Sequence, residues 1–160
     1  MRKKNMISAT HLHAMIVHFP IALLLVGFLS ELIGIVFKKS FFTQVSFYLL
    51  LLAAGGAITA YLTGDAAGDG MEGGSLKKAM DLHEQAAMIT MWLTIAAASA
   101  RTAYELLKNK MLWLKIAAFV LFAAATAGVG RTGYLGGQLV FKHAAGVELG
   151  LGNPDESFSE

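Results

Sequence analysis

The chain has 160 residues, a length typical of one domain, and 56% of them are hydrophobic while only 15% are charged. Soluble domains carry roughly 25% charged residues, so this composition indicates a membrane protein whose main partner is the lipid bilayer. The net charge of +2, without a basic cluster among aromatics, argues against a nucleic-acid partner, and the absence of cysteine excludes disulfides, iron–sulfur clusters and thiolate zinc sites.

The first apolar run extends from about residue 14 to residue 37 and follows a polar leader, residues 1–13. It is long enough for the ~20 residues that cross the hydrocarbon, and no small-residue cleavage site closes it, so we expect an uncleaved first span. Pro20 has no N–H, so a helix that begins before it leaves the carbonyl of Ile16 without a partner. The helix therefore starts at Pro20 or kinks there, which places His18 at a break in backbone hydrogen bonding.

Three further apolar runs predict three more spans, at about 41–62, 85–107 and 111–130. Glycines from position 128 onward break the last pattern, and a helix continuous to His143 would overshoot the bilayer. We therefore expect residues 133–143 to form a short interfacial or re-entrant segment.

The fold class is thus all-α: an integral membrane four-helix bundle over residues 14–144, with a short interfacial segment after the fourth span. Backbone groups in lipid must be satisfied internally, which leaves helices as the reading of runs this long. Residues 145–160 are polar and are expected to form a flexible tail. An even number of crossings puts both termini on one side of the membrane. The same side then carries all five histidines, namely His11, His13, His18, His83 and His143.

Imidazole is the ligand that this cysteine-free chain offers to haem iron, copper or zinc. No histidine pair has the spacing of a local metal motif, so a site must be built from different helices. His18, His83 and His143 are the candidate metal ligands, with His13 as a further cofactor-binding candidate. In the competing interpretation these histidines only hydrogen-bond loop carbonyls at the membrane face.

Two charges fall inside the apolar runs, and charged residues at such positions are functional candidates by default. Glu31 lies six residues before the end of the first run and Arg101 six before the end of the third, and these two runs point the same way. The two side chains should therefore share a depth. We favour a buried ion pair over a proton relay, and Glu105, one helical turn from Arg101, can share its charge.

Two stretches of the chain resemble bacterial domain-of-unknown-function family 2231, a family of predicted four-span membrane proteins. They are residues 17–24 (VHFPIALL) and 133–143 (GYLGGQLVFKH), and the resemblance covers about 11–147. Family members usually end the second motif with His-Gly-x-Gly-Val, where this chain has Ala144 in place of the first glycine. Similar domains are joined to c-type cytochrome or Rieske iron–sulfur modules. The resemblance therefore implies an electron-transfer setting in the bacterial inner membrane, with the histidine side facing the periplasm.

The leading hypothesis is a b-type haem, or another redox metal, held between helices by two imidazoles for membrane electron transfer. The preferred ligand pairs are His18 with His83 and His18 with His143, and Arg131 or Lys142 would meet the haem propionates. The alternatives are a cofactor-free structural or assembly subunit, a small transporter that uses Glu31 and Arg101, and a copper or zinc enzyme.

Overall fold

The computed structural model describes residues 8–68, 74–107 and 111–147, and all of its regular structure is helical. The all-α fold class predicted from the sequence is confirmed. Much of the predicted leader (1–7) and tail (148–160) lies outside the described residues. The helices, in chain order, are α1 (Ala9–Ile16), α2 (His18–Val36), α3 (Ser40–Gly68), α4 (Gly74–Leu106) and α5 (Leu112–His143).

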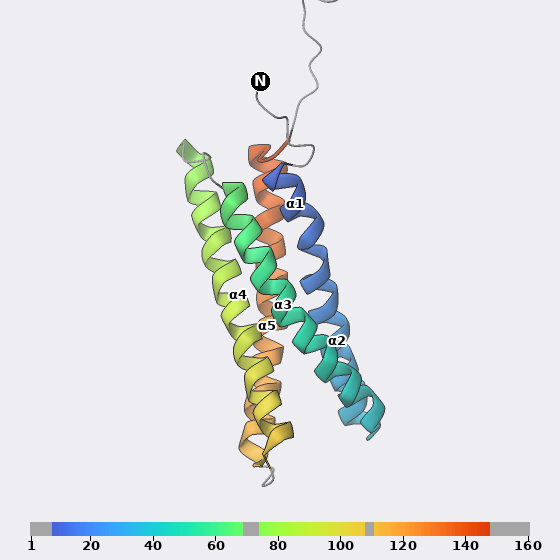
Figure 1. The fold of residues 1–160 in the computed structure, drawn as a ribbon. Helices are drawn as coiled ribbons and strands as arrows, with labels where there is room; N and C mark the ends of the chain where they lie inside the picture. Colours follow the sequence, from blue (N-terminus) through green and yellow to red (C-terminus); the bar gives the residue numbers. More distant parts are fainter. Residues whose placement is uncertain (1–7, 69–73, 108–110, 148–160) are drawn as a thin grey trace, which may run out of the picture.

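These helices form four long rods, because α1 and α2 together make one interrupted rod (Figure 1). The most extensive packing joins α4 to α5 and α2 to α3, so the bundle consists of two helical hairpins. The start of α1 and the end of α5 lie at the same end of the bundle, shown at the top of Figure 1. This is the arrangement expected of a chain with an even number of crossings.

The first rod is interrupted at Val17, three residues before Pro20. Pro20 cannot donate to the carbonyl of Ile16, and the next bond, from Ile21 N to the Val17 carbonyl, is long at 3.4 Å. The helix therefore begins before the proline and is interrupted beside it, which is the second of the two arrangements expected from the sequence.

The fourth rod differs from the prediction, because α5 continues without interruption from Leu112 to His143. The expected interfacial segment at 133–143 is therefore part of a regular helix. Its glycines do not break the helix, because α4 packs along it and supplies the stability that glycine's low propensity removes. At about 1.5 Å per residue, its 32 residues span ~48 Å. The helix end thus extends beyond the ~30 Å hydrocarbon core.

Three rods are long and apolar enough to cross a membrane by length and composition: Ala9–Val36, Ser40–Gly68 and Leu112–His143. The remaining rod, α4, buries polar residues such as Thr90, Thr94 and Arg101 and exposes apolar ones such as Ile89 and Trp92. These polar residues lower the mean hydropathy of α4, but they face the interior of the bundle and not the lipid. Because α4 also packs along α5, we infer that it crosses the same slab.

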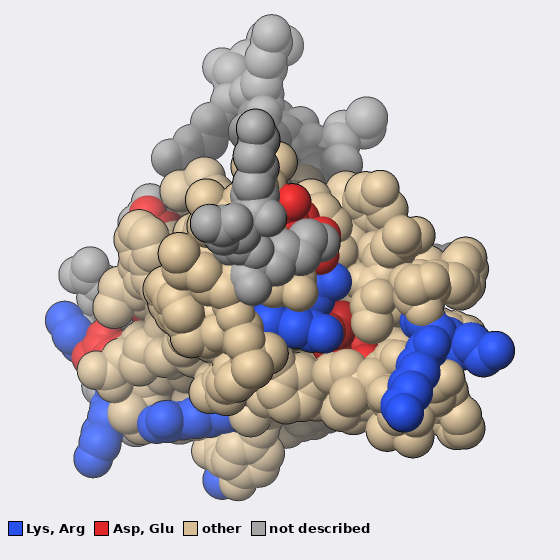
Figure 2. Space-filling view, turned by 90° about the horizontal axis from the view of Figure 1, so that it is seen from below, with Lys and Arg blue, Asp and Glu red and all other residues tan. Residues whose placement is uncertain are grey.

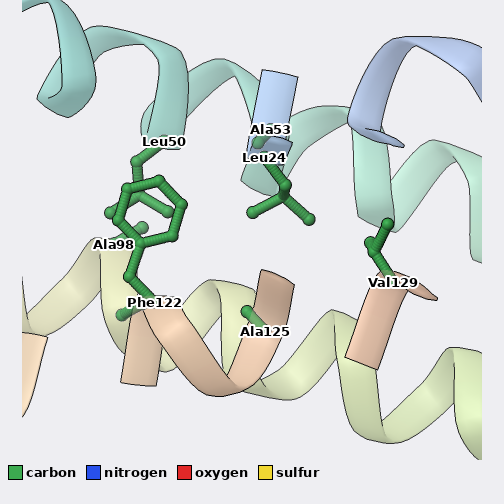
Figure 3. Close-up of a cluster of buried hydrophobic side chains, with 8 residues drawn as sticks. Leu24, Leu50, Ala53, Ala98, Phe122, Ala125 and Val129 are labelled. Carbon is green, nitrogen blue, oxygen red and sulfur yellow. The ribbon is translucent and has the colours of Figure 1, made fainter. Parts of the chain in front are cut away.

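The centre of the bundle is closed by a cluster of apolar side chains from four helices (Figure 3). Leu24, Leu50 and Phe122 fill the space between the rods, while alanines such as Ala53 and Ala125 let the backbones approach. This core separates two regions at opposite ends of the bundle, a histidine-lined cavity and a buried ion pair.

Candidate functional site

A cavity of about 730 Å³ opens at the end of the bundle where the chain begins and ends. All five helices contribute to its wall, and three histidines line it: His13 from α1, His18 from α2 and His83 from α4. The volume falls within the roughly 300–1,000 Å³ that is usual for small-molecule and cofactor sites. Helices that pack closely at the core thus separate here into a space of ligand size.

A hydrogen bond holds His83 against α5, and the lack of a side chain at Gly136 leaves room for its ring. Its Nδ1 lies 3.1 Å from the carbonyl oxygen of Thr132, and a carbonyl can only accept, so Nδ1 carries the proton. A Cβ atom at Gly136 would lie 3.1 Å from the ring's Cε1, so the ring rests where only a glycine leaves room. Burial lowers the pKa of His83, which precedes the apolar part of α4, and the hydrogen bond to the Thr132 carbonyl partly opposes this.

His13 is held against α3 in a similar way. Its Nδ1 lies 3.2 Å from Thr63 Oγ1, and that hydroxyl donates its own proton to a backbone carbonyl, either Thr59 at 2.9 Å or Ala60 at 3.1 Å. In that arrangement the hydroxyl accepts from His13, and Nδ1 carries the proton as it does in His83. A Cβ at Gly64 would lie 2.9 Å from the ring's Cε1.

The two rings consequently share one chemical state. A neutral imidazole protonated at Nδ1 has its lone pair on Nε2, the nitrogen that is free to ligate. Metal-binding histidines are usually oriented in this manner, by donating the other ring N–H to a carbonyl or similar acceptor. His13 and His83 line the same cavity. The arrangement therefore offers two preoriented ligands from opposite helical hairpins.

The other predicted site residues differ in their relation to the cavity. His18 lines the cavity but its side chain is exposed, while His143 and Arg131 are not among the lining residues. Within the described ranges no three histidine or acidic side chains come close enough to hold a metal ion, so a three-ligand site from His18, His83 and His143 is not formed. Phe141 and Ala145 on either side of His143 line the cavity, so α5 reaches it, but His143 itself is not part of the wall.

Sequence reasoning did not identify the two threonines and two glycines that hold the rings. Thr63 directly precedes Gly64, whereas Thr132 lies four residues before Gly136, so no shared spacing marks the two ring settings. A hydroxyl bond between Thr90 and Thr132 at 3.1 Å further ties α4 to α5 beneath His83. These contacts depend on helix pairing, which the sequence alone does not specify.

At the opposite end, Arg101 Nη1 lies 3.1 Å from Glu31 Oε1, and Nη2 lies 3.1 Å from Glu105 Oε1. The structure thus brings together the two charges expected to share a depth. Glu31 and Arg101 are only 4% and 9% exposed, and the rings of Phe47 and Tyr104 flank the guanidinium. Viewed from this end, other Lys and Arg side chains lie around the rim of the bundle (Figure 2). The position is that of a structural tie between α2 and α4, remote from the histidine cavity.

No curated protein and no solved structure matches the chain. A family model described as "Predicted membrane protein (DUF2231)" matches residues 9–149, which includes every described helix. The histidine cavity and the ion pair both lie within this match. The chain therefore belongs to the DUF2231 family of predicted membrane proteins, as its two end motifs indicated.

Proposed function

We propose that this membrane protein carries electrons through a b-type haem in the histidine cavity, which His13 and His83 would hold. The observation that carries the proposal is the matched setting of the two rings, each with Nδ1 beside a hydrogen-bonding oxygen and each set against a glycine on the neighbouring helix. Bis-histidine ligation needs two such imidazoles from different helices. This pair replaces the pairs His18–His83 and His18–His143 that the sequence favoured.

The composition of the cavity suits a flat, largely apolar group with a charged edge. Its inner wall includes Leu24, Ala57 and Val129, while Lys77 lies on the wall near the polar end. A cation there would pair with propionates, the role that the sequence assigned to Arg131 or Lys142. When bound, haem supplies a reversible one-electron carrier, and the protein's part is to ligate it, orient it and exclude water.

An absorption spectrum of the purified protein, with haem added during expression, tests this function. The wild-type chain and a His11→Ala control, altered outside the cavity, should show a Soret band. His13→Ala and His83→Ala should lose that band or show a high-spin spectrum while retaining their helical circular dichroism. Thr63→Val should weaken haem affinity by roughly 10- to 100-fold, the usual cost of losing a partner that orients a ligand.

The ligand pair is tested by the remaining histidines. If His18→Ala or His143→Ala abolishes the band and His13→Ala does not, the pair named here is wrong. If no variant or wild-type sample binds haem, and metal analysis finds no copper or zinc, the chain is better described as a cofactor-free assembly subunit.

A c-type cytochrome or Rieske-type protein is the proposed electron partner, and the histidine end then faces the periplasm of a bacterial inner membrane. Single cysteines introduced at Leu12 and at Phe37, which are exposed at opposite ends, test this orientation. In intact cells, permeabilised only at the outer membrane, a charged maleimide should label Leu12→Cys and leave Phe37→Cys unlabelled. The reverse pattern would place the cavity on the cytoplasmic side.

A further inference from the structure

The short helix α1 is held to the bundle from one side, chiefly by α3. None of its residues is buried, and within the described chain it packs against α3 and α2 but not against α4 or α5. Its contact with α3 includes the His13 ring and Thr63. Its other contact of note is at the amino end, where Thr10 meets the turn after α5.

A hinge lies directly after this helix. The rod is interrupted at Val17, where Pro20 removes one backbone hydrogen bond and the bond from Ile21 N is stretched to 3.4 Å. Beyond the interruption, α2 is anchored, because Pro20 and Leu24 are both buried. A helix with no buried residue is thus joined to an anchored one through a segment in which Pro20 leaves the Ile16 carbonyl without its helical hydrogen bond.

The cavity wall has two different kinds of edge. Between α1 and α5 its exposed residues are apolar, among them Ala14, Val140 and Phe141, whose side chain is 91% exposed. Between α3 and α4 the exposed wall residues are charged, namely Asp65, Lys77, Asp81 and Glu84. Because α5 extends past the hydrocarbon core, in a bilayer the first edge meets lipid at the boundary between acyl chains and headgroups, while the second faces headgroups and water.

We propose that α1 is a hinged flap, and that its movement admits an amphipathic, lipid-soluble ligand to the cavity from the bilayer, through the slot between α1 and α5. The ligand's apolar body passes the Ala14 and Phe141 edge, and its polar end meets the charged edge. This inference concerns access to the cavity proposed above as the haem site. The inference rests on the cavity and on the interruption at Val17, and not on haem binding. Its test therefore uses no haem, so the two proposals can fail separately.

The free end of the flap rests on a latch formed by Thr10 and Gly146. Gly146 has φ +74°, and a Cβ built there would lie 2.5 Å from Thr10 Cγ2. A side chain at Gly146 is strained at this φ and displaces the Thr10 methyl, so we expect Gly146→Ala to loosen the contact that holds the end of α1. The same Cβ would lie 3.9 Å from Thr10 Cβ, within the roughly 3.5–4.5 Å of disulfide bonds. The pair Thr10→Cys and Gly146→Cys can therefore lock the flap shut.

Because the chain has no cysteine, a reporter cysteine gives an unambiguous readout. Ala87→Cys places it on the α4 wall of the cavity. In liposomes, labelling of residue 87 by N-ethylmaleimide, which dissolves in lipid, is followed by mass spectrometry. Gly146→Ala should speed this labelling several-fold, whereas Gly130→Ala, whose Cβ meets nothing within 4 Å, should leave it unchanged.

The disulfide lock should slow labelling of residue 87 at least tenfold relative to the same protein after reduction. A cationic thiol reagent confined to water should react more slowly than N-ethylmaleimide, after each rate is normalised to an exposed cysteine at Leu12. Equal rates in the locked and reduced forms, or faster reaction with the cationic reagent, would overturn the proposal.

A second measurement covers the case in which the locked variant does not fold. Spin labels at Leu12 and Leu82, both exposed, report the distance from α1 to α4, and labels at Leu25 and Met88 report α2 to α4. The first pair should give the broader distance distribution, because only α1 lies beyond the hinge. Equally narrow distributions would show that α1 does not move.

Discussion

Replacement of Arg101 by methionine removes the charge at the centre of the buried ion pair while keeping a long side chain. Glu31, which is 4% exposed, would then lose the guanidinium that lies 3.1 Å from its carboxylate. Breaking a buried pair by removing one partner costs about 3–5 kcal/mol, since the other charge remains uncompensated. We expect a loss near the lower end of that range, because the carboxyl group can take up a proton instead of remaining ionised.

Two matched variants should cost less. Glu31→Gln keeps an acceptor oxygen, and Arg101 retains Glu105 at 3.1 Å and the Thr43 carbonyl at 3.5 Å, so we expect a loss of about 1–2 kcal/mol. Glu105→Gln should cost about 0.5 kcal/mol, because that side chain is 33% exposed and the pair is a single helical turn apart.

The assay is the free energy of unfolding in mixed micelles, measured for each variant and for the double variant Glu31→Gln/Arg101→Met. The double variant buries no charge, so it should be no less stable than Arg101→Met alone. Additive losses in the double variant, or a larger loss for Glu31→Gln than for Arg101→Met, would refute an ion pair that acts as a structural tie.

Two further predictions concern single side chains in α4 and α5. Ala144 ends α5 with φ 51°, so Ala144→Gly should raise the unfolding free energy by about 1 kcal/mol, whereas Ala145→Gly should not stabilise the protein. A Cβ at Gly128 would lie 2.6 Å from Thr90 Oγ1, so Gly128→Ala should destabilise by about 1–3 kcal/mol. The double variant with Thr90→Ala should recover part of that loss in thermal unfolding, and full additivity would contradict the clash.

The helical fold could be predicted from the sequence because the lengths of the apolar runs identify the segments that cross the bilayer. Runs of about 20 apolar residues must be helices, and short connections force neighbouring helices to be antiparallel. The helix ends were less accessible. α3 continues to Gly68 and α4 begins at Gly74, inside a stretch that hydropathy reads as polar. Where a helix extends beyond the hydrocarbon core, its residues need not be apolar, so hydropathy does not show where the helix ends.

By propensity alone the glycines of α5 predict a helix break, whereas in the structure two of them make room for side chains of α4. Gly128 accommodates Thr90 and Gly136 accommodates His83, while Gly130 and Gly133 meet nothing within 4 Å. A helix tolerates such residues when a neighbour packs along it, and hydropathy carries no information on that neighbour. The family glycine replaced by Ala144 is different, because at φ 51° it would relieve backbone strain.

The placement of His13 shows why the proposed ligand pair could not be predicted from spacing. His13 and His18 are five residues apart, and on a regular helix a separation of about 140° would point them to different sides. That calculation assumes one helix, and the rod is interrupted at Val17, so both residues line the same cavity. Pro20 predicts where the backbone hydrogen bonding is interrupted. It does not predict the orientation of α1 beyond that point. If Pro20→Ala restores a continuous helix, His13 should leave the Thr63 hydroxyl and haem affinity should fall, even though no ligand has been replaced. Unchanged haem affinity in a helix shown to be continuous would mean that His13 does not owe its position to the break.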